Sequence, residues 1–566
     1  MRSRTSILSA VSLTSLVVVA CSTTAVNRAN DPGTIPPGSE DAGGGLVLLS
    51  GDTGPKDSST VVPIGSGVDP VTCDEAKTAK SYLGCDFWPT VTYNSVDKAF
   101  DFAAVVSNPQ SENATVTTTG PSGYSNTVTI KPGATAKIYL PWVSRLKDEP
   151  SNGASVKLTA GAYHLVSSVP VVAYQFNPLE YQEGANSGPP GKDWSGCNNV
   201  GGFDKCYSLS NDASLLLPST AMTGNYRVYG PSGSEIISRD AFGFKRRLPS
   251  QAFIAITATQ AGTSVKLALS ATANVKAGTG VAALKAGGAP TTFAMNAGDV
   301  LLLMTASVND DLSGSLITGD KPVQVISGAP CTQFPYDTTF CDHVEESLFP
   351  VETLGKHYFV VPPTGPRANV PGMLVRIHGN IDGTKLTYSP QKPANCPAAI
   401  DAGQTIDCGD FGTDAGVLKT PFEVTGDHEF AVTTYQLGGV IADTKPTPGE
   451  SASGDPSQSQ AVAVEQYRSA YTFLTPSDYS SSFVDVVAPS DAAITLDGKA
   501  VTAAAVAISR GYGVRRLALN NLVGDGSHKI VANKPFGIQV SGYGQFTSYQ
   551  YPGGLNLGVI AEVPVK

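Results

Sequence analysis

Charged residues are scarce in this chain. They make up 15% of its 566 residues, against about 25% in an average soluble domain. Methionine occurs only 5 times, and long runs of Leu, Glu, Lys and Ala are missing. Glycine (59) and proline (40) are abundant, and Val, Thr, Ile and Tyr recur throughout. This composition disfavours helices and predicts short strands joined by many turns.

Clusters of basic residues are also missing. The longest is the triplet Lys245-Arg246-Arg247, and the net charge of the chain is −10. A nucleic-acid partner needs a positive patch that displaces the counterions of the phosphates. We therefore expect no nucleic-acid partner, and an acidic, soluble surface.

Local motifs of catalysis are missing as well. The sequence contains no G-x-S-x-G, no H-E-x-x-H, no P-loop and no G-x-G-x-x-G, and its Asp-rich turns do not match a calcium loop. The densest polar cluster is His343 with Glu345 and Glu346, which we interpret as a solvated loop beside Cys341. We expect no cofactor, no metal and no enzyme activity. A hydrolase with a spatially assembled site stays open, because triads are not local in sequence.

The N-terminus has the pattern of an export signal. Arg2 and Arg4 precede an apolar stretch over 7–20, which is too short to span a bilayer comfortably and ends on small residues. Residues 18–21, Val-Val-Ala-Cys, look like a bacterial lipobox, in which the cysteine is lipidated. We therefore expect a signal peptide over 1–20 and lipidation of Cys21. The alternative is an ordinary signal peptide with an incidental cysteine.

Residues 21–70 have the composition of a flexible tether. They contain Asp31-Pro-Gly, Ile35-Pro-Pro-Gly and Ala42-Gly-Gly-Gly, and such segments bury too little apolar surface to fold. We expect an exported protein that contacts the membrane only through its lipid. Ser22, rather than Asp, follows the cysteine, which favours the outer membrane, with exposure to the exterior left open.

Eight cysteines remain after Cys21, and they fall into four close pairs. Export places them in an oxidising compartment, where disulfides persist. The sequence does not fix the pairing, since eight cysteines allow 105 connectivities. Nearest-neighbour pairing is our hypothesis, and zinc binding is disfavoured because no C-x-x-C occurs. The predicted pairs are Cys73 with Cys85, Cys197 with Cys206, Cys331 with Cys341, and Cys396 with Cys408.

A strand pattern recurs four times along the chain. A turn is followed by apolar alternation at Ser167–Tyr174, Gly319–Ile326, Gly426–Thr433 and Ala532–Gln539. The equivalent apolar residues are Val171, Val323, Phe430 and Phe536. Each copy has strand-like hairpins upstream. The fold class predicted is all-β, with tandem antiparallel β-sandwich or blade-like modules over 71–213, 214–350, 351–460 and 461–566. One large β-structure made of the same strands is the alternative.

Aromatic residues gather in the stretch 177–213, which reads as a disulfide-closed insertion in the first module. Tyr and Trp favour binding surfaces, because they bury much area at low entropic cost. The residues proposed for a binding surface are Tyr181, Trp194, Phe203 and Tyr207. The alternative is that the neighbouring Tyr174 and Phe176 belong to the core and the other aromatic residues line the insertion.

Three features carry a resemblance to a known family: the repeated Lys-Pro-Val/Phe strand, the lipobox, and the phrase Tyr163-His-Leu-Val-Ser-Ser-Val-Pro-Val-Val-Ala-Tyr-Gln-Phe-Asn-Pro178. Together they resemble the IgGFc-binding protein N-terminal domain family. The resemblance covers about 73–566. It implies an extracellular β-rich binding module and offers no catalytic residues to carry over.

These observations predict an envelope-anchored extracellular binding or adhesion protein. Its partner would be a protein or a glycan at the cell surface, whose identity the sequence does not give. The alternative is a structural or scaffold lipoprotein of the envelope, and a hydrolase ranks third.

Overall fold

The structure is a computed structural model of the chain. It describes residues 69–148, 150, 153–184, 188–197, 205–239, 245–338, 341–446, 451–519 and 526–561. The chain divides into two units, 1–60 and 61–566. The predicted signal peptide, Cys21 and nearly all of the tether lie outside the described residues. Within those residues, no helix is long and apolar enough to cross a membrane.

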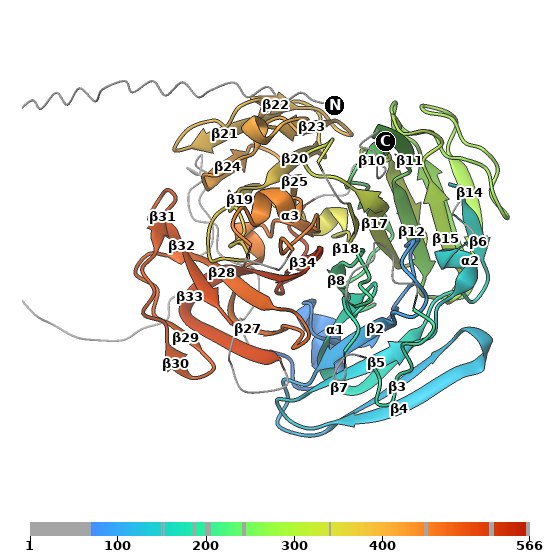
Figure 1. The fold of residues 1–566 in the computed structure, drawn as a ribbon, viewed down its shortest axis with the longest axis horizontal. Coiled ribbons are helices and arrows are strands. Elements are labelled where there is room, and N and C mark those ends of the chain that lie inside the picture. The colour runs from blue at the N-terminus through green and yellow to red at the C-terminus, as the bar shows by residue number, and fades with distance from the viewer. Residues whose placement is uncertain are drawn as a thin grey trace, which may run out of the picture. The chain divides into compact units, whose positions relative to one another are not determined.

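The described part of the chain is an all-β structure, which confirms the predicted fold class (Figure 1). Its α-helices are short: α1 (Cys73–Ala79), α2 (Ser144–Lys147) and α3 (Gly439–Ala442). The hydroxyl of Thr72 caps α1 by accepting the N–H of Glu75, whose carboxylate accepts the N–H of Thr72 in return. Pairings between the named strands are antiparallel, as a chain rich in tight turns allows.

The strands form four sheet groups in chain order. Group 1 is one sheet of β1 (Gly84–Phe87), β2 (Phe102–Ser107), β3 (Ala114–Gly120), β4 (Tyr124–Ile130), β5 (Thr135–Leu140), β7 (His164–Phe176) and β8 (Ala213–Leu215). Group 2 has a sheet ordered β18-β17-β12-β15-β6, a sheet ordered β14-β13-β16-β9, and the hairpin β10–β11. Its strands are β6 (Val156–Leu158), β9 (Asn225–Arg227), β10 (Ser234–Arg239), β11 (Lys245–Ser250), β12 (Phe253–Ala258), β13 (Thr263–Ala268), β14 (Thr291–Met295), β15 (Val300–Met304), β16 (Leu316–Gly319), β17 (Val323–Thr332) and β18 (Asp342–Ser347).

The remaining two groups follow the same scheme. Group 3 has sheets ordered β19-β24-β21-β22 and β23-β20-β25-β26. Its strands are β19 (His357–Val360), β20 (Leu374–Gly379), β21 (Thr384–Ser389), β22 (Ala399–Ile400), β23 (Thr405–Cys408), β24 (Phe422–Gly426), β25 (Phe430–Tyr435) and β26 (Gln458–Gln460). Group 4 is one sheet of β27 (Arg468–Leu474), β28 (Ser481–Pro489), β29 (Ile494–Leu496), β30 (Lys499–Ala500), β31 (Val506–Ala507), β32 (Tyr512–Ala518), β33 (Ser527–Gly544) and β34 (Thr547–Pro552).

In each group one stretch of chain passes from one set of paired strands to another. In group 1 this is β7, which pairs with β3 before Pro170 and with β2 after it. The same passage is made by β16 followed by β17 in group 2, by β24 followed by β25 in group 3, and by β33 in group 4. Pro is tolerated at such a passage, because the strand pairing is interrupted there and no ladder hydrogen bond requires the N–H that Pro lacks.

The four apolar residues of the recurring strand pattern lie just after these passages. Val171, Val323, Phe430 and Phe536 are each 0% exposed. The sequence pattern therefore marks a structural position that is the same in all four groups. The boundaries of the four predicted modules stay a proposal, and β6 already departs from them, since it lies within 71–213 but pairs with β15 of group 2.

Four inner strands, one from each group, bring the groups together. β8 packs beside β18, β18 beside β26, β26 beside β34, and β34 beside β8. Polar side chains join neighbours: the hydroxyls of Ser214 and Ser347 lie 2.8 Å apart, and Gln460 Nε2 donates to the Ser347 carbonyl at 2.6 Å. Figure 1 shows β8, β18 and β34 near the middle of the molecule.

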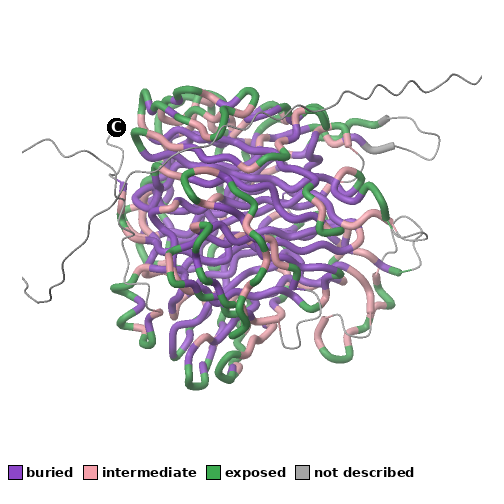
Figure 2. The backbone as a smooth tube through the Cα atoms, turned by 90° about the vertical axis from the view of Figure 1, so that its left-hand side faces the viewer, coloured by how far each residue is buried: buried purple, intermediate pink, exposed green. Residues whose placement is uncertain are grey.

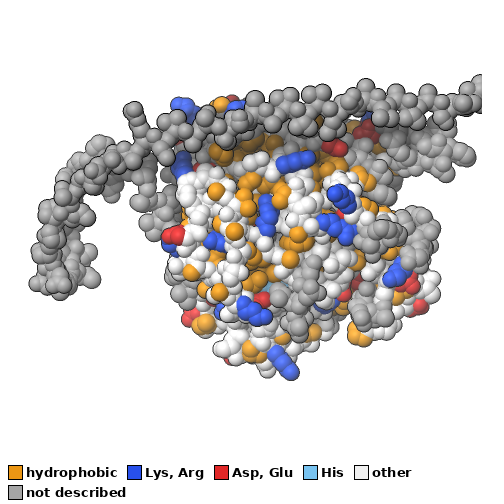
Figure 3. Space-filling view, turned by 60° about the vertical axis from the view of Figure 1, so that its left-hand side comes forward, with side chains coloured by type: hydrophobic (Ala, Val, Ile, Leu, Met, Phe, Trp, Pro, Cys, Tyr) orange, Lys and Arg blue, Asp and Glu red, His pale blue; other side chains and the backbone are white. Residues whose placement is uncertain are grey.

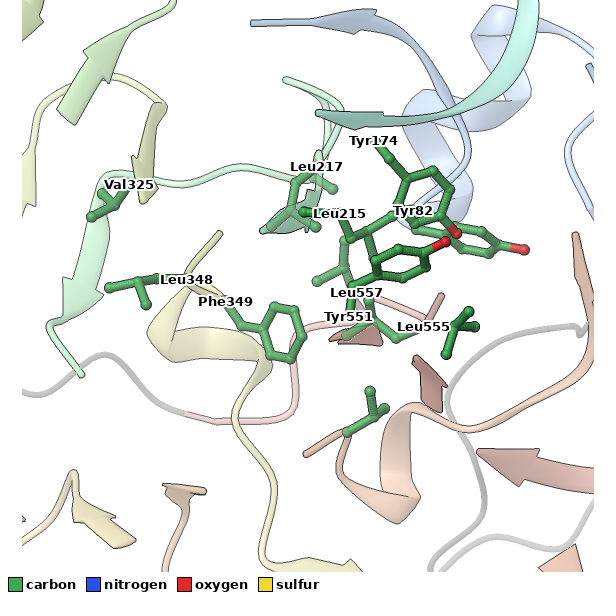
Figure 4. Packing of buried hydrophobic residues seen from close by; sticks show 14 of the residues in the cluster. Tyr82, Tyr174, Leu215, Leu217, Val325, Leu348, Phe349, Tyr551, Leu555 and Leu557 are labelled. Atoms are coloured by element: carbon green, nitrogen blue, oxygen red, sulfur yellow. The ribbon is translucent and has the colours of Figure 1, made fainter. Parts of the chain in front are cut away.

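One hydrophobic core extends through all four groups. It contains Tyr174 and Leu215 of group 1, Val325 of group 2, Ala431 of group 3 and Tyr551 of group 4. The rings of Tyr174 and Tyr551 have centroids 4.5 Å apart (Figure 4). Burying an aliphatic side chain of this core, such as Leu215, stabilises the fold by about 1.5–3 kcal/mol. Figure 2 shows buried backbone filling the interior and exposed residues mainly at its margins.

All four predicted disulfides are present. Cys73 bonds to Cys85, Cys197 to Cys206, Cys331 to Cys341, and Cys396 to Cys408. Nearest-neighbour pairing is thus confirmed. Each bond closes a short loop of 9 to 12 residues, so it stabilises local connections rather than joining the sheet groups.

Candidate ligand-binding face

The connections that lead into the four inner strands lie together. They span 177–212 before β8, 333–341 before β18, 436–457 before β26, and 545–546 before β34. We call these four connections the loop face. Residues 185–187, 198–204, 339–340 and 447–450 of it lie outside the described residues.

Hydrogen bonds link each connection to the next. Tyr207 donates its hydroxyl to Gln545 Oε1 at 2.5 Å, and the Phe546 N–H donates to the Ala452 carbonyl at 3.5 Å. Gly438 in turn donates its N–H to the Phe334 carbonyl at 2.8 Å. Connections gathered at one end of a rigid β scaffold are a common place for ligand binding.

Three carboxylates lie buried beneath the loop face. Asp212 directly precedes β8, Asp342 begins β18, and Asp455 lies three residues before β26. Their exposed fractions are 0%, 0% and 2%. Asp212 Oδ2 accepts the backbone N–H of Glu345 at 3.0 Å and of Gln458 at 3.1 Å, so one side chain joins three inner strands.

Burial raises the pKa of all three carboxyls well above the ordinary value. For Asp342, the charges of Asp455 and Asp212 raise the pKa further, while hydrogen bonds from Thr547 and the Asn211 N–H oppose the rise. Two carboxylates that raise each other's pKa favour a form in which one carries a proton.

The polar cluster at His343 is not the solvated loop that the sequence suggested. His343, Glu345 and Glu346 belong to β18 and are 0% exposed. Glu345 accepts hydrogen bonds from Thr92, from Gln175 at 2.7 Å and from Asn177 at 3.2 Å. The prediction was wrong because β18 pairs with β17 and packs beside β8 and β26, which together cover its side chains. These contacts give the cluster a structural role in joining groups 1 and 2.

The three described members of the predicted aromatic set, Tyr181, Trp194 and Tyr207, are each buried or half-buried. Tyr181 is 4% exposed, and its ring packs against Tyr479 with centroids 5.3 Å apart. Tyr207 is half-buried and packs edge-on against Phe546. Trp194 is half-buried, and Phe203 lies outside the described residues. A ligand role stays a prediction, for which Trp194 and Tyr207 offer more surface than Tyr181.

The Trp194 segment is held by a buried ion pair. Lys192 Nζ lies 2.9 Å from Glu180 Oε1, 2.8 Å from Asp101 Oδ2 and 4.2 Å from the centroid of the Trp194 ring. Burial raises the pKa of Glu180 to about 7, although Lys192 lowers it. The ammonium therefore holds the Trp194 segment by contacts to its charge and through a cation–π interaction.

The three aspartates were not predicted from the sequence. A faint signal exists, since Asp212 and Asp455 lie one and three residues before an inner strand and Asp342 begins one. Asp at the start of a strand is common, however, and the convergence of the three needs the tertiary structure. Within the described residues, no group of three or more His, Cys, Asp or Glu side chains is arranged to hold a metal ion. On the face drawn in Figure 3, Lys and Arg are spread among apolar and uncharged side chains.

A disulfide-bonded all-β scaffold with long connections at one end is typical of exported binding proteins. Comparison with known proteins agrees with this class. The family model described as IgGFc binding protein matches residues 212–542, and the chain belongs to this family. The phrase at 163–178, which carried the resemblance in the sequence, lies outside the matched residues.

One curated relative is the human IgGFc-binding protein (Homo sapiens). It is 38% identical over 100 residues, which are 16% of this chain and 2% of the relative. The match thus spans a very small part of the relative's length. No solved structure matches the chain.

Proposed function

We propose that the chain is an exported, envelope-anchored binding or adhesion protein whose loop face contacts a protein or glycan ligand outside the cell. The observation that carries the proposal is the convergence of connections from all four sheet groups at one end of a shared core. Family membership supports a binding role over catalysis. The Fc region named for the human relative is one candidate ligand among several.

Anchoring through Cys21 is the second part of the proposal. The four disulfides support export, since such bonds persist in oxidising compartments. Labelling producer cells with a radioactive fatty acid tests the anchor. Label should appear on the wild-type chain and be absent from Cys21→Ser, with the chain then released from the membrane fraction.

Binding is tested with the purified full chain against immobilised glycans, mucin, immunoglobulin Fc and envelope extract from the producer. Trp194→Ala probes the loop face, and Lys266→Ala, an exposed residue of β13, is the matched control. Saturable binding that Trp194→Ala weakens and Lys266→Ala leaves intact supports the proposal. Binding to envelope extract alone would favour the structural alternative, and binding to no probe would contradict a recognition role.

A further inference from the structure

A polar cleft of about 550 Å³ lies at the edge of the loop face. The hairpin β10–β11 lines it with Glu235 and Arg247, and the connection after β15 lines it with Asn309. Tyr336 and Asp337 come from the disulfide-closed connection before β18. The volume is within the range of small-molecule sites, about 300–1,000 Å³.

The elements around the cleft are fixed to one another. The side chain of Gln333 accepts the Ile237 N–H at 2.9 Å and donates to the Ile237 carbonyl at 3.1 Å. Ser250 donates its hydroxyl to the Cys331 carbonyl, and the Gly233 N–H donates to the Asp310 carbonyl at 2.9 Å. The hairpin and the disulfide-closed connection thus fix each other's position. Binding of a ligand would therefore cost little conformational entropy.

Tyr336 gives the cleft an anchored aromatic ring. Its centroid lies 6.0 Å from that of Phe334 and 6.2 Å from that of Phe411, within a buried aromatic cluster. Its hydroxyl lies 3.3 Å from the Ser232 hydroxyl. These contacts hold the ring of Tyr336, a half-buried residue that lines the cleft.

The polar groups of the cleft offer both donors and acceptors. Arg247 and Glu235 form an ion pair at 2.5 Å, but their side chains are 64% and 41% exposed. An exposed pair of this kind contributes little stability and can exchange its hydrogen bonds for those of a ligand. Asn309 and Asp337 are also exposed.

The charges of the residues that line the cleft limit which class of ligand it can bind. Glu235 and Asp337 would repel a free anion, and Arg247, which interacts with both carboxylates, offsets much of their attraction for a free cation. An apolar group would leave polar side chains unpaired. The hydroxyls of a sugar both donate and accept, and the C–H face of a pyranose packs on an aromatic ring. The geometry points to a neutral saccharide as the ligand of this cleft, an inference that rests on the proposed binding function and names the ligand class.

The test uses the purified full chain and a series of neutral hexose and N-acetylhexosamine oligosaccharides, with a sialylated oligosaccharide and deglycosylated mucin as other probes. Binding is measured by titration calorimetry. The cleft variants are Arg247→Gln and Asp337→Asn; Asn suits the backbone of residue 337, whose φ is 64°. Lys266→Gln is the matched control outside the cleft.

The expected result is saturable binding of at least one neutral oligosaccharide, weakened about tenfold by either cleft variant and unchanged by Lys266→Gln, because a good hydrogen bond to a charged group is worth about 1.5 kcal/mol. The inference is overturned if no neutral oligosaccharide binds, or if binding is the same in the cleft variants. It is also overturned if only the sialylated probe binds. If deglycosylated mucin still bound in that case, the proposed binding function would stand and only the saccharide site would be rejected.

Discussion

Asp212 accepts the backbone N–H of Gln458 at 3.1 Å, although the two residues are 246 positions apart. The same carboxylate oxygen accepts the N–H of Glu345, and the other accepts the N–H of Ala213. One buried side chain thus satisfies backbone donors of three inner strands. These hydrogen bonds link groups 1, 2 and 3 directly.

Asp212→Ala is expected to destabilise the fold strongly. Removing the carboxylate leaves buried N–H groups without partners, and each unsatisfied group costs roughly 1–3 kcal/mol. Chemical unfolding should show a loss of at least about 3 kcal/mol from several such groups. The exposed Asp414→Ala should stay within about 0.5 kcal/mol of wild type. A stability loss at Asp212 no larger than that would contradict the role given to this residue.

The buried carboxyls should make stability depend on pH. The pKa values of Asp342 and Asp455 are raised in the folded chain, so the folded state binds protons more tightly than the unfolded state. Their contribution is fully present below the ordinary Asp pKa and is lost as pH rises through the folded values. Asp455→Asn, which cannot ionise, should therefore stabilise the chain relative to wild type, by more at pH 8 than at pH 5.

Urea unfolding at a series of pH values measures this difference. The exposed Asp414→Asn serves as control and should show no such trend. An equal effect of Asp455→Asn at pH 5 and pH 8 would mean that Asp455 does not titrate across this range.

Lys192→Met should loosen the connection 177–212. The substitution keeps the apolar stem but removes the charge that lies between Glu180 and Asp101 and above Trp194. Breaking a buried pair on one side leaves the other charge unpaired. Hydrogen exchange should become faster over 188–197, and Trp fluorescence should shift. Glu180→Gln is the companion variant, and unchanged exchange in both would contradict the ordering role.

Replacing Cys331 and Cys341 together with serine should destabilise the chain by about 2–3 kcal/mol, since the bond closes a loop of about ten residues. The larger local effect is expected at Tyr336 and Asp337, which lie inside that loop. Saccharide binding by the cleft should weaken more in this variant than in the matched Cys73→Ser/Cys85→Ser double variant, whose bond is remote in sequence from the cleft. Equal weakening in the two would indicate a global effect.

Much of the architecture could be predicted from local signals. Strand-forming residues and dense turns predicted an all-β chain, and close cysteine pairs predicted the disulfides. Both depend on neighbours in sequence: turns reverse the chain within a few residues, and a short cysteine spacing limits the reachable partners. The export signal and Cys21 also rest on sequence pattern, and they stay predictions.

The loop face could not be predicted in the same way. The sequence placed His343 and Glu345 in a solvated loop and gave Tyr181 to a binding surface, yet all three side chains are buried. No neighbour in sequence indicates this burial, because it comes from contacts with residues of other groups more than a hundred positions away, such as Tyr479 at Tyr181 and Gln175 at Glu345.

The sequence by itself determined the strand pattern, with its equivalent apolar residues Val171, Val323, Phe430 and Phe536, and the disulfide spacing, since each depends on local geometry. Only the tertiary structure decided that four inner strands meet, that Asp212, Asp342 and Asp455 lie beneath one face, and that Tyr336 and Arg247 line one cleft. Long-range packing brings these residues together, and a single sequence carries no local trace of which distant strands will be neighbours.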